Sequence, residues 1–390
     1  MFEFETKSFD EETSGRSGVL RHTHEIDENI LTPTRAITNV DVGRVDELRK
    51  AADIFRGGIE DVPNGIMEIT YPYYGHKLTT LTQSEPSTHQ ANLLAQYIYE
   101  VNKVALFNPL FSFSKGIKLT RKEIEMLIAL QAWAKYSPIT ISEPHPFCSL
   151  SEFSKMLEFG LESVDKQTRE KTPVVVQLST ATKRELIESK LKVAKDLGIS
   201  GAILNYASIP KYFDVYYALS QLTKGNEFNK FFFHLSCVPP TFFNASLMNI
   251  LVSLGLDSFA LRGIVFGSKS KEVVVKEKRR KISWFNKNSW GFDDVTQWIN
   301  KKESIGCNCS VENNRTKKEF IDLYTGTDTL SEATGIHNTI STNYELEKSR
   351  VAIEQSKLFE YINSKFIGKA AFKNIQNAIN QSLERDLTSF

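Results

Sequence analysis

The sequence predicts an α/β protein built on an eight-stranded TIM-type barrel. Between residues 35 and 266, short runs of β-branched and aromatic residues alternate with amphipathic segments at helical spacing, which is the pattern of a parallel sheet with crossover helices. Eight expected strands and seven expected helices match the repeat of a (β/α)8 barrel. An open doubly wound sheet is the alternative, but neither a Gly-rich dinucleotide fingerprint nor a phosphate-loop pattern follows any strand.

The expected elements alternate along the chain. The strands are placed at 35–39, 65–70, 103–107, 138–142, 173–178, 201–206, 230–235 and 257–260. The helices are placed at 43–55, 86–100, 121–136, 149–170, 183–198, 210–224 and 241–254. In such a barrel the chemistry lies at the carboxyl ends of the strands.

Two flanking regions complete the predicted organisation. Residues 1–30 are expected to form an antiparallel N-terminal piece, and residues 31–266 the barrel domain. Residues 267–390 are expected to form a basic segment, a zinc-site-like subdomain and C-terminal helices near 345–361 and 367–384, where apolar residues recur at helical spacing.

The composition excludes several classes of protein. Hydrophobic residues make up 41% of the chain, which is ample for a core. The 48 basic and 47 acidic residues give a net charge of +1, so a polyanion has to be bound by a local patch. Four cysteines are too few for a disulfide framework, and no signal peptide or membrane-spanning run is evident. We therefore expect a cytoplasmic protein that does not contact a membrane.

A candidate metal site lies in the C-terminal region. Cys307 and Cys309 are followed, 28 residues after the second cysteine, by His337. Thiolates and an imidazole suit tetrahedral Zn²⁺, and Glu312 is a candidate fourth ligand. The alternative is a pair of reduced cysteines in a turn and a histidine at a helix cap.

The same motif resembles that of the queuine and archaeosine tRNA-guanine transglycosylases. That family carries, after an eight-stranded barrel, a Cys-x-Cys-x-x-Cys zinc motif and a later His-Asn pair. Cys307 and Cys309 match the first two cysteines, Glu312 falls on the third, and His337-Asn338 match the end. The resemblance extends over about residues 15–360, through segments at 15–20, 32–33, 176–179, 255–259 and 344–354.

Residues that the resemblance makes central to base exchange differ in this chain. The family's aspartate nucleophile falls on Ala260, and its second aspartate falls near Asn108. The base-recognition aspartate falls near Ser142-Glu143, and the paired glycines read Leu204-Asn205. Alanine cannot attack the sugar and asparagine cannot transfer a proton, so the two-step exchange cannot be carried over unchanged.

Carboxylates remain where residues at the top of a barrel are expected. They are Glu143 after the fourth strand, Asp257 in the eighth, and Asp41 after the first. A carboxylate that activates water suffices for one-step hydrolysis of an N-glycosidic bond through an oxocarbenium-like sugar. Glu143 and Asp257 are therefore the candidate catalytic residues. The alternatives are a rigid surface loop for Glu143 and a turn residue for Asp257.

Four residues are candidate contacts to a base: Asn108, Gln177, Tyr71 and His234. Gln177 follows three valines in a strand expected to be buried, where an amide needs partners or a ligand. Tyr71 belongs to an aromatic segment that can stack on a flipped base, although packing beneath a loop is the commoner role. Three roles are open for His234: a general acid, a phosphate contact, or a core histidine whose hydrogen bonds are satisfied within the protein.

A basic segment indicates nucleic acid as the partner. Residues 269–281 hold seven basic and two acidic side chains, and aromatic residues follow. Such a segment contacts phosphates and stacks on bases, or else forms a solvated charged hairpin. The candidate DNA-binding residues are Lys269, Lys271, Lys278, Arg279, Arg280, Lys281 and Trp284.

The chain is more similar to the DNA-acting branch of the superfamily, the DpdA-like DNA 7-deazaguanine transglycosylases and relatives linked with phage defence, than to the tRNA enzymes. We therefore expect a DNA glycosylase that excises a modified base and leaves an abasic site, with a glucosylated hydroxymethylcytosine of phage DNA as a candidate substrate. Base exchange with Asp257 as the nucleophile, and a non-catalytic transglycosylase-like subunit, are the alternatives. DNA is favoured over tRNA, and both a monomer and a homodimer are compatible with the sequence.

Overall fold

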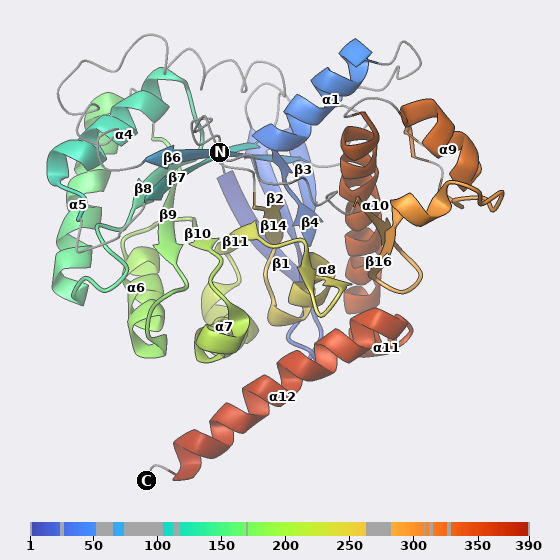
Figure 1. Ribbon diagram of the computed structural model, residues 1–390. Coiled ribbons are helices and arrows are strands. Elements are labelled where there is room, and N and C mark those ends of the chain that lie inside the picture. The colour runs from blue at the N-terminus through green and yellow to red at the C-terminus, as the bar shows by residue number, and fades with distance from the viewer. Residues whose placement is uncertain are drawn as a thin grey trace, which may run out of the picture.

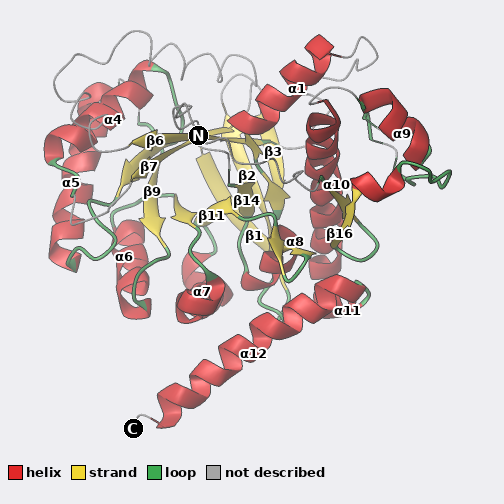
Figure 2. Cartoon of the chain, viewed as in Figure 1, coloured by secondary structure: helices red, strands yellow, loops and turns green. Residues whose placement is uncertain are grey.

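The protein is a mixed α/β protein in which helices cover a parallel sheet, as Figures 1 and 2 show. A computed structural model describes residues 2–23, 27–51, 65–73, 104–111, 118–168, 171–262, 282–307, 309–311, 315–325 and 329–388.

The parallel strands are β4 (Thr34–Arg35), β5 (Ile37–Thr38), β6 (Ile66–Tyr73), β7 (Val104–Phe111), β8 (Ile139–Ser142), β9 (Val174–Ser179), β10 (Gly201–Asn205), β11 (Phe232–Val238) and β14 (Ser258–Leu261). They form one sheet with the order β4-β14-β11-β10-β9-β8 and another with the order β5-β6-β7. Only Ala36 separates β4 from β5, so one stretch of chain belongs to both sheets. At the opposite edges, β7 lies beside β8.

The eight expected strands are confirmed, with β4 and β5 together forming the first. The helices between them are α1 (Asn39–Ala51), α4 (Arg121–Trp133), α5 (Leu150–Gln167), α6 (Arg184–Asp196), α7 (Ile209–Lys224) and α8 (Leu247–Leu251), with 3-10 turns η2 (Asn226–Phe228) and η3 (Val252–Leu254). Local signals fix several of their starts; a capping box of Thr120 and Glu123, for example, begins α4. The helix expected at 86–100 lies outside the described residues.

One expected helix, at 241–254, begins late. Residues before Leu247 form a hairpin of β12 (Thr241–Phe242) and β13 (Ala245–Ser246). Phe243 and Asn244 have φ of +47° and +62°, and a right-handed helix cannot include them.

The antiparallel N-terminal piece is confirmed as a sheet of β1 (Phe2–Phe9), β2 (Arg16–Thr23) and β3 (Asp27–Thr32). Its apolar side chains form a buried cluster with inward-facing residues of the parallel strands. We call this cluster the apolar plug: Phe2, Phe4, Leu20, Ile30, Ala36, Ile66, Val104, Leu106, Val175, Ile203, Phe232 and Ala260. Ile66, Val104 and Phe232 are the first residues of their strands. The apolar plug therefore lies at the amino-terminal ends of the parallel strands, on their inward-facing side.

The C-terminal region forms a unit against β13. β15 (Ser283–Asn286) and β16 (Gly291–Asp294) extend the hairpin into a four-stranded sheet with the order β12-β13-β16-β15. The 3-10 turn η4 (Val295–Trp298) and helices α9 (Lys317–Tyr324), α10 (Thr329–Glu354), α11 (Leu358–Asn363) and α12 (Phe366–Thr388) follow. Figure 1 shows α10 standing beside α1 and α12 running beneath α7 and α8.

Helix α10 begins 16 residues before the expected start at 345. Its buried face is rich in polar residues, among them Thr334, His337, Thr339 and Asn343, so the apolar periodicity that marks a helix is weak there. No helix in the described part of the chain is long and apolar enough to cross a membrane.

Candidate active site and metal centre

A polar cluster lies on the inward-facing side of the parallel strands, nearer to their carboxyl ends than the apolar plug. Its members, called here the interior cluster, are Glu68, Thr70, Asn108, Gln177, Asn205, His234 and Ser236. Side chains of a strand alternate between its two faces, so positions two apart face the same side. Five members accordingly follow a plug residue by two positions: Glu68, Asn108, Gln177, Asn205 and His234. The interior thus changes from apolar to polar toward the carboxyl ends of the strands.

Glu68 is the centre of this cluster. Its Oε2 lies 2.6 Å from Nε2 of His234, and its Oε1 accepts hydrogen bonds from Ser236 and Thr70 at 2.6 Å and from Asn108 at 3.1 Å. Burial alone would raise the pKa of Glu68, but the hydrogen bonds from His234, Ser236 and Thr70 outweigh it and hold the pKa below its usual value. Glu68 is therefore a buried carboxylate with a histidine partner.

The two ring nitrogens of His234 have different surroundings. Both His234 and Glu68 have fully buried side chains. While Nε2 faces Glu68, Nδ1 is buried without a hydrogen-bond partner among the described residues. A buried imidazole nitrogen without a partner is uncommon. Such an atom is available to a ligand or a water molecule.

Three amides lie next to this pair. Nε2 of Gln177 donates to Oδ1 of Asn108 at 2.7 Å and to the carbonyl oxygen of Pro109 at 2.6 Å. Nδ2 of Asn108 lies 3.1 Å from Oδ1 of Asn205. Asn108, Gln177 and His234, expected to contact a base, are therefore brought together. Tyr71 lies on β6 opposite Pro109 of β7, but its side chain is outside the described part of the chain.

Sequence reasoning assigned no role to Glu68. The signal was a charged residue within the otherwise apolar start of β6, flanked by Met67 and Ile69. An unpaired charge is too costly to bury in a strand, so a buried partner had to exist.

Glu143 does not join the interior cluster. It follows β8, but its Oε2 lies 2.6 Å from Nζ of Lys190 in α6, and its Oε1 accepts from the backbone N–H of Ser179 at 2.6 Å. Nζ of Lys190 also donates to the carbonyl oxygen of Pro146 at 2.9 Å. Burial raises the pKa of Glu143, partly offset by Lys190. The expected catalytic role does not fit this geometry, because the carboxylate faces a covering helix and not the interior.

Asp257 is likewise placed away from the interior cluster. It precedes β14 and therefore lies at the amino end of the strands. Its Oδ1 accepts from Nε of Arg16 at 2.8 Å, and its Oδ2 accepts from Nη2 of the same guanidinium and from the N–H of Phe233. Arg16 and Asp257 are both fully buried, so the pair joins the N-terminal sheet to the parallel strands. This geometry corrects the expected roles of Asp257 as acid-base residue and as nucleophile.

The cysteines and the histidine predicted to bind metal lie together. Cys307, Cys309 and His337 are buried, and their ligand atoms all lie within 4.8 Å of one another. Sγ of Cys309 is 3.5 Å from Nδ1 of His337, and Nε2 of His337 is 3.3 Å from the carbonyl oxygen of Phe285. Zn²⁺ takes thiolate at ~2.3 Å and imidazole at ~2.0 Å, and a carbonyl on the second imidazole nitrogen is the usual way to orient a histidine ligand. These residues therefore fit a zinc ion, whereas Glu312 lies outside the described residues.

Trp284 belongs to the packing of this centre. Its ring stacks on that of His337 with centroids 3.4 Å apart, and its side chain is 4% exposed. The expected DNA-contacting role of Trp284 is therefore wrong, because the ring is covered. The remaining residues assigned to DNA binding, Lys269, Lys271, Lys278, Arg279, Arg280 and Lys281, lie outside the described part of the chain.

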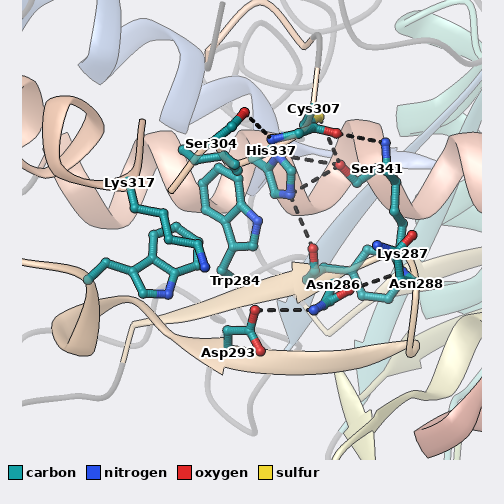
Figure 3. Close-up of a pocket in the computed structure, with 14 residues that line it drawn as sticks. Trp284, Asn286, Lys287, Asn288, Asp293, Ser304, Cys307, Lys317, His337 and Ser341 are labelled. Atoms are coloured by element: carbon teal, nitrogen blue, oxygen red, sulfur yellow. Dashed lines mark hydrogen bonds between the residues drawn. The ribbon is translucent and has the colours of Figure 1, made fainter. Parts of the chain in front are cut away.

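A pocket of about 230 Å³ opens beside Cys307 (Figure 3). Trp284 and His337 form one wall, and Lys287 and Lys317 lie at its edge. Both lysines already have partners: Nζ of Lys287 donates to the carbonyl oxygen of Gly306, and Nζ of Lys317 pairs with Glu303. The pocket is therefore lined by two residues of the candidate metal centre, Cys307 and His337.

Comparison with known proteins identifies no family. No protein-family model and no curated protein matches the chain. Among solved structures, a GH26 beta-mannanase from Bacteroides ovatus shares 10% identity, with a TM-score of 0.37 over 57% of this chain and 84% of the mannanase. A beta-glucuronidase from Ruminococcus gnavus shares 12% identity, with a TM-score of 0.35 over 65% of this chain and 52% of the glucuronidase, about half its length. Overlap of this extent establishes neither a family nor an activity.

Proposed function

We propose that the protein is a DNA glycosylase that hydrolyses the N-glycosidic bond of a modified nucleobase and leaves an abasic site. The observation that carries the proposal is the buried Glu68–His234 pair beside three amides. A carboxylate that accepts a proton and amides that read a base edge are what this reaction requires. A glucosylated hydroxymethylcytosine of phage DNA remains a candidate substrate, with phage defence as the corresponding role.

In the proposed reaction a water molecule attacks C1′ of the flipped nucleotide while the bond from C1′ to the base nitrogen breaks. The bonding electrons leave with the base. The carboxylate of Glu68 takes the proton of the attacking water, and the developing sugar cation is stabilised by the same negative charge. In this scheme His234 enters the step with a proton on each ring nitrogen, gives the Nδ1 proton to the departing base, and keeps the Nε2 proton that it donates to Glu68. Asn108, Gln177 and Asn205 hold the base by its polar edge.

The residues at two positions where a nucleophile was expected favour hydrolysis over base exchange. Ala260, where the transglycosylase nucleophile would fall, belongs to the apolar plug. Asp257, the alternative nucleophile, is held by Arg16 at the amino end of the strands. Position 260 carries no carboxylate and Asp257 is held by Arg16, so neither position supplies a nucleophile for an ester with the sugar, and water is the attacking group in the proposed reaction.

The proposal includes membership of the DNA-acting branch of the tRNA-guanine transglycosylase superfamily and a closed (β/α)8 barrel. The closed barrel is supported by the adjacency of β7 and β8 and by the contacts of Glu68 with His234 and of Asn108 with Gln177, which join the two parallel sheets. The superfamily membership is proposed from the sequence resemblance alone. Cys307, Cys309 and His337 would hold a structural Zn²⁺, which when bound supplies folding energy to the C-terminal unit. Lys269, Lys271 and Lys278 to Lys281 would contact DNA phosphates.

The complete hydrogen bonding of Glu68 favours a second candidate, a non-catalytic subunit that binds a base without releasing it. Four groups already donate to the carboxylate, as in a purely structural network.

The test is to incubate the protein with unmodified DNA, with phage DNA carrying modified bases, and with tRNA. Mass spectrometry detects a released base, and alkaline cleavage detects abasic sites. We expect release from modified DNA alone. Binding of modified DNA without release of any base would support the second candidate and exclude the first.

A further inference from the structure

The hairpin β12–β13 presents an exposed aromatic ring at its tip. Phe243 is 62% exposed, and its ring meets that of Phe242 edge-on, with centroids 4.6 Å apart. Phe242 is half-buried and packs against the hydrophobic core. The outer ring therefore rests on an inner ring that the core supports.

The backbone at the tip is one that phenylalanine rarely adopts. Phe243 and Asn244 are the two turn residues between the paired Phe242 and Ala245, and both have positive φ. Turns of this kind favour Asn-Gly, and a bulky residue at positive φ is an outlier. Backbone strain of this kind concentrates at functional sites, so phenylalanine at this position calls for a functional explanation.

The hairpin is held firmly at its base. Ala245 of β13 pairs with Gly291 of β16, and the backbone N–H of Ser246 donates to the carbonyl oxygen of Trp290 at 2.7 Å. Pro239 and Pro240 precede the hairpin and restrict its backbone. The ring at the tip is therefore carried by a hairpin whose base is hydrogen-bonded to the C-terminal unit.

The hairpin follows two members of the interior cluster in the sequence. His234 and Ser236 belong to β11, and the hairpin begins three residues after β11 ends at Val238. β11 runs parallel to β10 and passes its end, because Asn205 pairs with Ser236. Phe243 therefore follows the carboxyl end of a strand that contributes two members of the interior cluster.

We propose that Phe243 is a wedge that enters duplex DNA beside the target nucleotide and displaces its base toward the interior cluster. The inference rests on the proposed function, because a base paired in a duplex cannot reach Glu68 without leaving the stack. An apolar ring on a rigid support suits this role, since wedges inserted between base steps are apolar side chains. The partner is double-stranded DNA. A single strand needs no wedge.

The first experiment compares base release from duplex and single-stranded versions of the same modified DNA. For Phe243→Ala we expect release from the duplex to fall at least tenfold and release from the single strand to stay within twofold of wild type. Trp133→Ala is the matched control, because Trp133 is also an exposed aromatic residue, 54% exposed, but ends the helix that precedes β8, on the amino-terminal side. Equal losses on both substrates, or no loss on either, would overturn the wedge while leaving the glycosylase proposal intact.

A second measurement does not depend on catalysis. A duplex carrying 2-aminopurine next to the modified base fluoresces more strongly when the stack opens. Wild type and Trp133→Ala are expected to raise the signal, and Phe243→Ala to leave it at the level of free duplex. A rise with Phe243→Ala equal to that of wild type, or no rise with wild type, would contradict the wedge. A wedge signal without base release would contradict only the proposed chemistry.

Discussion

Nε2 of His234 lies 2.6 Å from Oε2 of Glu68 although the two residues are 166 positions apart in the chain. They come from β11 and β6, which belong to the two different parallel sheets. The contact therefore places an acid-base pair in the interior that the strands share, with the amides of Asn108 and Gln177 beside it. Each consequence of this arrangement can be measured.

Glu68→Gln should abolish base release by the folded protein. Glutamine has the size of glutamate but cannot accept the proton of the attacking water, so we expect a loss of about 10²- to 10⁴-fold in rate. The measurement is the single-turnover rate on modified DNA, with thermal unfolding as a check of the fold.

The pH dependence of this rate follows from the lowered pKa of Glu68. The folded-state pKa of Glu68 lies below the ordinary value of 4.5, so the carboxylate is still mostly ionised at pH 4.5. The reaction rate should therefore begin to decline only below pH 4.5. The same ionisation contributes stability above the unfolded-state pKa, and this stability is lost as pH falls through the folded-state pKa. An acidic limb near pH 6 would show that another group controls the rate.

Glu143→Gln should lower stability without slowing the reaction of the folded protein. The substitution leaves Lys190 buried without its counter-charge, which typically costs about 3–5 kcal/mol. Urea unfolding measures the loss, and replacing Lys190 by methionine in the same chain should recover part of it. A rate loss as large as that of Glu68→Gln, at full folding, would restore Glu143 as a catalytic residue.

Asp257→Asn should act in the same way through Arg16. The carboxylate accepts from the guanidinium and from the backbone of Phe233, so its loss weakens the attachment of the N-terminal sheet. We expect a lower urea midpoint and no change in the rate of the folded fraction. A covalent adduct between wild-type protein and DNA that disappears in Asp257→Asn would instead identify this residue as a nucleophile.

The candidate metal centre predicts about one zinc ion per chain, because Cys307, Cys309 and His337 would form one ligand set. Cys309→Ser should lower the zinc content, measured by atomic emission, and the melting temperature. Cys148→Ser is the matched control, since Cys148 is also a buried cysteine that forms no disulfide but lies outside the ligand set. Zinc content unchanged in Cys309→Ser would exclude this site.

The sequence predicted the strands well because strands buried on both faces read as short apolar runs, as Val174–Val176 does. It also named Asn108, Gln177 and His234 as candidate contacts to a base, and the structure brings these three residues together. It failed at Glu143 and Asp257 because each lies one residue outside its strand, where the alternation of faces no longer fixes the direction of a side chain. Glu143 faces Lys190 in a covering helix, and Asp257 stands at the amino end with Arg16. Contacts between residues this distant in the chain leave no local pattern to detect.

The most direct test of the central claim is the release of base from modified duplex DNA by wild type, Glu68→Gln and Glu143→Gln in parallel, followed by mass spectrometry. Both substitutions remove a buried carboxylate, but only one removes it from the interior cluster. We predict release by wild type and by folded Glu143→Gln, and none above background by Glu68→Gln. Release by Glu68→Gln at the wild-type rate would contradict the account.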